Sequence, residues 1–396
     1  MKIHTTKSGE TIATIANQYE VSEETIRRIN ALDDGEPAAG EELLIQIPTR
    51  SYTAVYGDTV DRIAIRFGIR KNDLYRLNPW IIEKELKAGQ KLTLKTGDRK
   101  KGMAVANGYF YQGCTEEKLM RAMPFLTYVS FAAAKADKRG IHKIFDCKRW
   151  VDICIQNSKI PLVRVFDGYS SRYDTESDLT EFAKELITLT EDGGFKGIVL
   201  DACSLSNSAE NFSRFLMILR KMMIGCDLIL ITEINEKSPV EFSEYSDGSI
   251  LYYPKYAMDT PLSFEEGERR IIGDLACNGE SAKVFIDLPS LAIGNNGYMT
   301  TDEALNNARK KGLEINTNKS TLLSEFNSRK QGDYRYTSLS GIAALLELVN
   351  EFDYSGISFD IMRTPLSHLM MYDSAFKTSY TTFVRSREGC SRADGE

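Results

Sequence analysis

The sequence contains few of the residues on which metal sites and disulfide frameworks depend. It has three histidines in 396 residues, His4, His142 and His368, and none has the spacing of a metal-ligand pair. Seven cysteines stand at scattered positions, with no Cys-x-x-Cys pair. An odd, scattered set of thiols is typical of a chain made in a reducing compartment. We therefore predict no metal site, no cofactor, no disulfide framework, and synthesis in the cytoplasm.

Long apolar runs and an excess of positive charge are also absent. No stretch is apolar for long enough to span a membrane. The 50 Lys and Arg residues are outnumbered by 56 Asp and Glu, which gives a net charge of -6. The first residues, Met1 to Thr6, run directly into a predicted strand, so we expect no signal peptide. These absences predict a protein with neither a membrane nor a nucleic acid as its partner.

The strongest positive feature is an internal repeat within residues 1–96. A shift of 48 positions superimposes seven identical residue types. The seven residues Thr5, Gly9, Thr11, Ile15, Ala16, Arg28 and Asn30 recur as Thr53, Gly57, Thr59, Ile63, Ala64, Arg76 and Asn78. A unit this small buries little core by itself, which is typical of a compact module used in tandem.

Each repeat is expected to fold as a strand, two helices and a strand. A short extended segment precedes a turn at Gly9 or Gly57, where glycine can take positive φ. Apolar residues at helical spacing follow the turn, and a second short helix ends at Asn30 or Asn78. An Ala-Gly turn then leads to a closing strand. The predicted order is β-α-α-β.

This pattern resembles the LysM module in its tandem form. LysM modules bind glycans that contain N-acetylglucosamine, in peptidoglycan or chitin. The resemblance implies a sugar groove between the first turn and the loop after the second helix of each repeat. The implied glycan-binding residues are Gly9, Glu10, Thr11, Ile12 and Asn30, and Gly57, Asp58, Thr59, Val60, Asn78, Pro79 and Trp80.

An alternative interpretation gives these residues structural roles alone. Gly, Thr and Asn at such positions also cap helices and shape turns. Trp80 is one of only two tryptophans. It stands where its ring would stack on a sugar face, but packing in a core explains an aromatic residue equally well.

Beyond residue 103, short β-branched and aromatic runs alternate with helical patterns. The strand candidates are residues 104–110, 126–131, 161–166, 197–202, 227–232, 249–253, 283–288 and 356–361. Eight strands with helices between them indicate an α/β barrel of the TIM type. A doubly wound open sheet is the structural rival, but no Gly-rich phosphate loop follows the first strand.

Four of these stretches resemble the barrels of glycoside hydrolase family 18 found in bacterial spore-lytic enzymes. They are residues 126–130, 195–201, 251–253 and 356–359, which correspond to the second, fourth, sixth and eighth barrel strands. In those enzymes tandem LysM modules precede the barrel. The implied domains are residues 1–48 and 51–96 (LysM modules), 97–103 (linker) and 104–390 (barrel).

The catalytic motif of that family is degenerate here. The family carries Asp-Gly-x-Asp-x-Asp-x-Glu on strand four, where the last three acids share one face because a strand has a period of two. The Glu protonates the glycosidic oxygen, while the preceding Asp orients the N-acetyl group of the substrate. This chain has Lys196 and Val199 at the first two Asp positions, Asp201 at the third, and Cys203 at the Glu position. A thiol is a poor general acid for this reaction, so we expect no efficient hydrolysis.

Hydrolytic activity would survive if a carboxylic acid at another position had taken over the role of the missing Glu. Glu233, at the end of the predicted fifth strand, is the best substitute by position. Asp201, Tyr253 and Asp360 remain candidates for holding a ligand in the barrel. Further charged residues stand near predicted strand ends: Asp167, Lys255, Asp287 and Arg363. We expect them to form a solvated or ion-paired rim rather than a catalytic set.

The leading interpretation is a binding protein for N-acetylglucosamine polymers, most simply peptidoglycan, with a family 18-like barrel that lacks the catalytic Glu. One alternative is an active peptidoglycan N-acetylglucosaminidase with displaced catalytic residues. A second is a non-catalytic scaffold whose partners are spore-coat proteins. The resemblance to spore-lytic enzymes also implies deposition on the spore coat or cortex, or association with the cell wall.

Overall fold

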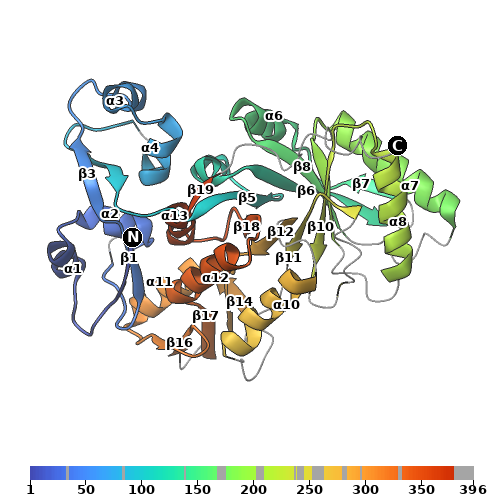
Figure 1. Ribbon diagram of the computed structural model, residues 1–396. Helices are drawn as coiled ribbons and strands as arrows, with labels where there is room; N and C mark the ends of the chain where they lie inside the picture. Colours follow the sequence, from blue (N-terminus) through green and yellow to red (C-terminus); the bar gives the residue numbers. More distant parts are fainter. Residues whose placement is uncertain are drawn as a thin grey trace, which may run out of the picture.

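The computed structural model describes residues 1–32, 35–82, 85–137, 140–166, 175–201, 209–235, 238, 245–251, 263–278, 283–294, 297–328 and 332–378. Two small N-terminal units lie next to each other at one end of the molecule, and a larger barrel occupies the other end (Figure 1). A separate antiparallel sheet lies beside the barrel and near the first unit (Figure 1).

Both repeats have the predicted β-α-α-β order. In each, the first and last strands pair in antiparallel fashion beneath two short helices. The first repeat consists of β1 (Lys2–Thr5), α1 (Ile12–Tyr19), α2 (Glu23–Ile29) and β2 (Glu42–Ile45). The second consists of β3 (Pro48–Thr53), α3 (Val60–Phe67), α4 (Lys71–Leu77), the 3₁₀ turn η1 (Pro79–Ile81) and β4 (Lys91–Thr96).

Eight parallel strands close into a barrel. The ring closes because β5 pairs with both the last strand, β18, and the second strand, β6. In order around the ring the strands are β5 (Gly102–Phe110), β6 (Tyr128–Asp137), β8 (Ile160–Phe166), β9 (Gly197–Asp201), β10 (Ile229–Ile234), β11 (Gly248–Leu251), β12 (Val284–Asp287) and β18 (Gly356–Asp360). Each overlaps one of the eight predicted strands, so the predicted barrel is confirmed and the open sheet was the wrong alternative.

Further elements cover and extend the barrel. Strand β7 (Gly140–Lys143) forms a hairpin with β6, and β19 (Phe376–Thr378) adds to β5. The surrounding helical elements are α5 (Glu116–Ala122), η2 (Met123–Phe125), α6 (Lys148–Gln156), α7 (Glu176–Asp192), α8 (Ala209–Met222), the π-helical turn η4 (Glu265–Arg269), α10 (Arg270–Asn278), α12 (Leu339–Glu351) and α13 (Leu366–Ala375).

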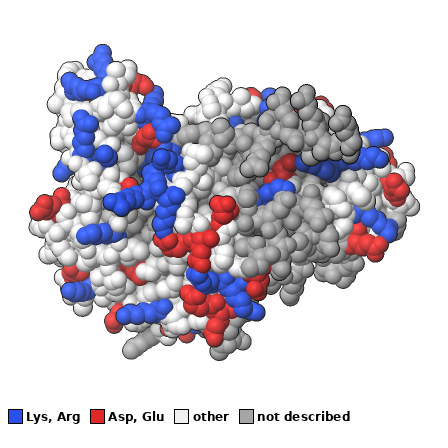
Figure 2. All heavy atoms as spheres, in the orientation of Figure 1, with Lys and Arg blue, Asp and Glu red and all other residues white. Residues whose placement is uncertain are grey.

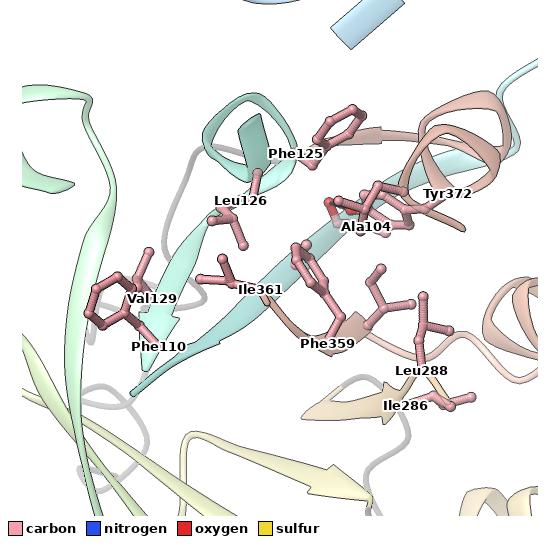
Figure 3. Close-up of a cluster of buried hydrophobic side chains, with 14 of the residues drawn as sticks. Ala104, Phe110, Phe125, Leu126, Val129, Ile286, Leu288, Phe359, Ile361 and Tyr372 are labelled. Atoms are coloured by element: carbon pink, nitrogen blue, oxygen red, sulfur yellow. Dashed lines mark hydrogen bonds between the residues drawn. The ribbon is translucent and has the colours of Figure 1, made fainter. Parts of the chain in front are cut away.

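The two faces of the barrel wall carry different residues. Alternate residues of each strand point inward, where apolar side chains fill the floor of the barrel. The floor cluster is Val105, Tyr128, Leu162, Val199, Ile229, Ile231, Ile250 and Phe285. Outward-facing residues pack against the helices. In Figure 3, Tyr372 of α13 lies against Ala104 of β5, and its hydroxyl donates a 3.0 Å hydrogen bond to the Ala104 carbonyl.

A five-stranded antiparallel sheet between the seventh and eighth barrel strands was not predicted. It consists of β13 (Leu291–Gly294), β14 (Gly297–Thr300), β15 (Asn316–Asn318), β16 (Leu323–Ser328) and β17 (Gly332–Thr337), with α11 (Thr301–Lys311) between β14 and β15. Apart from β13, its strands are short and rich in polar residues, so they lack the apolar runs by which the barrel strands were predicted. We call this unit the insertion.

The first repeat is docked on the insertion by a buried ion pair. Arg309 of α11 binds both carboxylate oxygens of Glu41 at 3.0 and 2.5 Å. The same guanidinium donates to the carbonyls of Asn30 and Ala31 at 2.9 and 2.7 Å. The side chains of Arg309 and Glu41 are 5% and 1% exposed. The second repeat is anchored to α13 by its own ion pair, between Arg76 and Asp373.

We predict that Arg309→Met lowers the free energy of unfolding by about 3–5 kcal/mol, because it leaves the Glu41 carboxylate buried without its cation. Hydrogen exchange of residues 1–48 should accelerate more than exchange in the barrel. The matched control is Arg335→Met, which removes an exposed pair with Glu325 and should cost at most about 1 kcal/mol. Equal effects of the two substitutions in denaturation and hydrogen exchange would contradict this account of the docking.

Candidate functional site

Polar side chains line the mouth of the barrel, above the apolar floor. Arg164, Asp201, Glu233 and Asp287 each follow a floor residue by two positions and therefore point inward. Asp201 and Glu233 lie directly opposite each other in the β9–β10 register. All of them stand toward the carboxyl ends of parallel strands, which is the end where barrels of this type carry their active sites.

Arg164 is the central cation of this mouth. Its Nε and Nη2 each donate a 2.6 Å hydrogen bond to an oxygen of the Glu233 carboxylate. Nη2 also lies 3.5 Å from Oδ2 of Asp201, and the guanidinium lies 5.6 Å from the centre of the Tyr109 ring. Burial alone would lower the pKa of Arg164, but the Glu233 carboxylate raises it. The result is a bidentate ion pair inside the barrel.

The Arg164 pair decides what Glu233 can do. Glu233 is 4% exposed, and both of its oxygens accept from the guanidinium. A general acid must carry a proton and present it to the substrate. Protonation of Glu233 would break a charge-assisted hydrogen bond and leave Arg164 partly uncompensated. Glu233, the substitute acid predicted from its position, thus serves as the counter-ion of Arg164.

Asp287 has a different environment from Glu233. Its Oδ1 is buried and has no hydrogen-bond partner among the described residues. Burial, and secondly the nearby Glu233 carboxylate, raise the pKa of Asp287 well above its usual range, although a hydrogen bond with Ser358 opposes the shift. Ser358 in turn accepts from Asn107 at 3.0 Å, and Asn107 accepts from Ser130 at 2.6 Å. Asp287 is therefore a carboxyl group with a raised pKa at the edge of a hydrogen-bonded polar network.

Asp360, a predicted ligand candidate, has local partners. Its Oδ1 accepts from the backbone N–H groups of Met362 and Arg363 at 2.9 and 3.1 Å. The same oxygen accepts from the Tyr111 hydroxyl at 3.2 Å. Oδ2 lies 3.5 Å from Nε of Arg363. These contacts hold the turn that follows β18, so this carboxylate has a structural role in the described part of the chain.

The degenerate motif of strand four lies partly within the described residues. Val199 is in the floor cluster, and Asp201 follows it on the same inner face, as the period of the strand predicts. Lys196 is exposed at the opposite end of the strand, just before β9. Cys203 and Tyr253 lie outside the described residues. No carboxylate is therefore present at the inner position of Val199, two residues before Asp201.

The turn residues of the repeats hold their own module together. Glu10 accepts from the Lys7 amide at 2.9 Å, and Asp58 accepts from the Val55 amide at 2.9 Å. Thr11 and Thr59 cap the helices that follow, because their hydroxyls accept from amides three residues on. Gly9 and Gly57 have φ values of 77° and 83° and turn the chain before the helix. Ile12 and Val60 are the first residues of α1 and α3.

The two asparagines act as identical internal clamps. Asn30 donates to the carbonyls of Ile26 and Leu44, and it accepts from the Leu44 amide at 2.7 Å. Asn78 repeats this pattern with Leu74 and Thr93. Pro79 begins η1, directly after this clamp. Trp80 is 9% exposed and packs in the main core, with the Arg28 guanidinium 5.8 Å from its ring, so its surroundings favour the packing role.

The two candidate sugar grooves differ in whether a side chain of the protein itself binds there. In the first repeat the Glu36 carboxylate accepts from the Ile12 amide at 2.6 Å, and Arg27 holds that carboxylate at 2.9 Å. The loop on the other side of this groove is bound by Arg309. In the described part of the second repeat no such side chain binds the amide of Val60. The first groove is therefore partly occupied from within the chain.

Comparison with known families identifies the repeats. Residues 4–46 and 52–95 match the LysM domain family. The N-terminal units are two LysM domains. A Bacillus subtilis protein named "Putative sporulation-specific glycosylase YdhD" is 34% identical over 94 residues, which are 24% of this chain and 22% of that protein. The match thus spans about a fifth of the length of that relative.

Solved structures resemble the whole arrangement. The spore cortex-lytic enzymes SleL of Bacillus megaterium and Bacillus cereus match with a TM-score of 0.72, at 15% and 16% identity, over 96% of this chain and 99% of theirs. A GH18 chitinase from Cycas revoluta in complex with (GlcNAc)3 matches with a TM-score of 0.57 and 14% identity, over 68% of this chain and 99% of the chitinase. At these identities the likeness establishes the fold: two LysM domains followed by a barrel of the GH18 type.

Among the described residues, no group of three or more His, Cys, Asp or Glu side chains has an arrangement suited to a metal ion. No helix among the same residues has both the length and the apolar character needed to cross a membrane.

Arg164 was not identified from the sequence, although a signal for it exists. It is the one charged residue in an otherwise apolar strand, residues 160–166, and it follows Leu162 by two positions. That spacing places a cation inside the barrel. Its partner, by contrast, is 69 residues away and follows only from the register of β8, β9 and β10.

We predict that Asp287→Asn stabilises the protein at neutral and alkaline pH. Because the pKa of Asp287 is higher in the native state than in the unfolded state, wild-type stability should fall as pH rises above about 4, where the unfolded state begins to release that proton. The fall is at most about 1.4 kcal/mol per pH unit and continues up to the native pKa. Denaturation of wild type and variant at several pH values should therefore give stabilities that converge near pH 4 and diverge above it. A constant difference would contradict the raised pKa.

Proposed function

We propose that this protein binds peptidoglycan, or another N-acetylglucosamine polymer, through its LysM domains, and that its barrel does not hydrolyse the bound glycan. The presence of two LysM domains is the observation that carries the binding proposal. The glycan would lie against the turns at Gly9 to Ile12 and Gly57 to Val60, and against the loops that begin at Asn30 and Asn78. Most of the side chains named there act by shaping those turns.

The proposal of an inactive barrel rests on the chemistry of its mouth. Strand four offers Val199 where the family motif has an Asp, and Cys203 replaces the Glu in the sequence. Glu233 is bound on both oxygens by Arg164. A substrate-assisted mechanism needs a proton donor next to a carboxylate that orients the acetamido group. Asp201 and Glu233 both lie against the Arg164 guanidinium instead.

One observation favours the enzyme alternative. Asp287 is a carboxyl group with a raised pKa that faces the mouth, and general acids in glycosidases are carboxyl groups with raised pKa values. Its inward neighbour on the same strand is Phe285, however, and no second carboxylate precedes it at the spacing of the family motif. An N-acetylglucosaminidase with a displaced acid would therefore depend on Asp287 rather than on Glu233.

The proposed location is the spore or the cell wall. The relative YdhD is named for sporulation, and the SleL enzymes are named for lysis of the spore cortex. A protein with LysM domains and no hydrolytic activity would be retained on such a wall, where coat proteins are possible neighbours in the scaffold alternative. Neither a nucleic acid nor a membrane is part of the proposal.

We expect the full chain to cosediment with purified, insoluble peptidoglycan, and Gly57→Val to weaken retention. A β-branched residue at φ 83° strains the turn by about 1–2 kcal/mol, which corresponds to roughly a 5- to 30-fold loss if the turn holds the glycan. The control is Gly297→Val, at φ 118° with no atom near the added side chain, in the insertion. Wild-type protein that stays in the supernatant would refute the binding proposal.

A further inference from the structure

The two LysM domains carry opposite charge. Residues 1–48 contain nine acidic and four basic side chains, whereas residues 49–96 contain five acidic and ten basic ones. The whole-chain charge of -6 conceals this contrast. Figure 2 shows Lys and Arg gathered on the lobe that Figure 1 labels β3, α3 and α4. Two copies of one module thus present very different surfaces.

Several cations of the second domain are exposed and have no ion-pair partner among the described residues. They are Arg50, Arg62, Arg66, Lys87, Lys91 and Lys95. Other cations of the domain are already neutralised: Arg70 binds Asp73, and Lys71 binds Asp61. Asp58 interacts electrostatically with Arg62 and Arg66, so it offsets part of this charge, but cations remain in excess on this part of the domain surface.

Four of these residues, Arg50, Arg62, Arg66 and Lys95, form what we call the basic strip. Arg62 and Arg66 are one helical turn apart on the exposed face of α3. Arg50 lies opposite Lys95 in the β3–β4 ladder. The guanidinium of Arg50 lies 4.9 Å from the centre of the Phe67 ring, at the end of α3, so the strip runs from the helix to the strands.

Aromatic rings hold the arginines of the strip in place. The Tyr52 and Phe67 rings pack together with centroids 4.9 Å apart. Arg66 donates to the Tyr52 hydroxyl at 2.9 Å and lies 5.9 Å from the centre of that ring. A guanidinium fixed in this way loses less conformational freedom when it binds an anion. Two cations of the strip, Arg50 and Arg66, are thus oriented before any ligand binds.

The strip adjoins an exposed apolar edge at the first turn of the domain. Arg62 donates to the Gly57 carbonyl at 3.0 Å, and the preceding Tyr56 is 98% exposed. Val55 beside it is also exposed. In the first domain the position of Tyr56 is held by Ser8, and the amide of Ile12 is bound by Glu36. Of the two domains, the second therefore places a group that complements a sugar face beside groups that complement a carboxylate.

We propose that the basic strip of the second LysM domain binds the free carboxylates of an acidic glycan, namely peptidoglycan strands with their acidic substituents. This assignment rests on the proposed function and adds to it that the second domain supplies most of the affinity. A glycan fits better than a nucleic acid, because the strip is short, an exposed tyrosine adjoins it, and the chain as a whole is acidic.

The test is cosedimentation of the full chain with peptidoglycan at 50 and 500 mM NaCl. A second sample of the same peptidoglycan has its carboxylates converted to amides by carbodiimide coupling. We expect wild type to bind native peptidoglycan roughly tenfold more weakly at high salt, because screening shortens the range of the charges. Amidation should cause a similar loss at low salt, without any change in the protein.

The variant that removes the strip is Arg50→Gln, Arg62→Gln and Arg66→Gln together. It should bind native peptidoglycan about tenfold more weakly than wild type, with little further loss on amidation. The matched control is Lys148→Gln, Arg149→Gln and Arg214→Gln, which removes the same charge from exposed helices of the barrel. It should bind as wild type does.

The outcomes separate this inference from the proposed function. Equal binding by wild type and the strip variant, with no effect of salt or amidation, overturns the role of the strip and leaves peptidoglycan binding intact. Failure of wild type to bind either peptidoglycan sample overturns the proposed function itself. Binding of duplex DNA by wild type as tightly as native peptidoglycan, lost in the strip variant, overturns the choice of a glycan as the partner.

Discussion

The guanidinium of Arg164 is the charge on which the mouth of the barrel depends. Strand alternation directs Asp201, Glu233 and Asp287 to the same interior, where unpaired carboxylates cost several kcal/mol each. One partly buried cation, Arg164, forms a bidentate pair with Glu233 and lies 3.5 Å from Asp201. Burial raises the pKa of the third carboxyl group, Asp287, which favours its neutral form. A single cation thus serves two carboxylates in the mouth.

The pairing of Arg164 with Glu233 bears on the proposed function. A substrate-assisted glycosidase needs a proton donor next to a carboxylate that orients the acetamido group of the substrate. Here Val199 of strand four belongs to the apolar floor, and the acid of the next strand is paired with Arg164. This pairing supports our proposal that the barrel does not hydrolyse the glycan and that the LysM domains recognise it. The Arg309–Glu41 and Arg76–Asp373 ion pairs join those domains to the insertion and to α13.

The parts predicted from sequence are those with local signals. The repeat appeared through matched positions such as Gly9 and Gly57, and the barrel through short apolar runs separated by helices. The inner position of Val199 and Asp201 followed from the period of a strand. The insertion was missed because its short polar strands, such as β15, carry no such pattern. The Arg164–Glu233 and Arg309–Glu41 pairs join residues far apart in the chain, so they depend on register and docking that no local pattern reveals.

The central claim is that this chain holds peptidoglycan without cleaving it, and mass spectrometry of defined muropeptides tests it most directly. Wild type and Cys203→Glu are incubated with the substrate under conditions in which the protein is bound, and the soluble products are followed over time. The account predicts no cleavage by either protein, because restoring one acid leaves Val199 and the Arg164–Glu233 pair in place. Release of N-acetylglucosamine-terminated fragments by wild type, abolished by Asp201→Asn, Glu233→Gln or Asp287→Asn, would contradict it and establish a glycosidase.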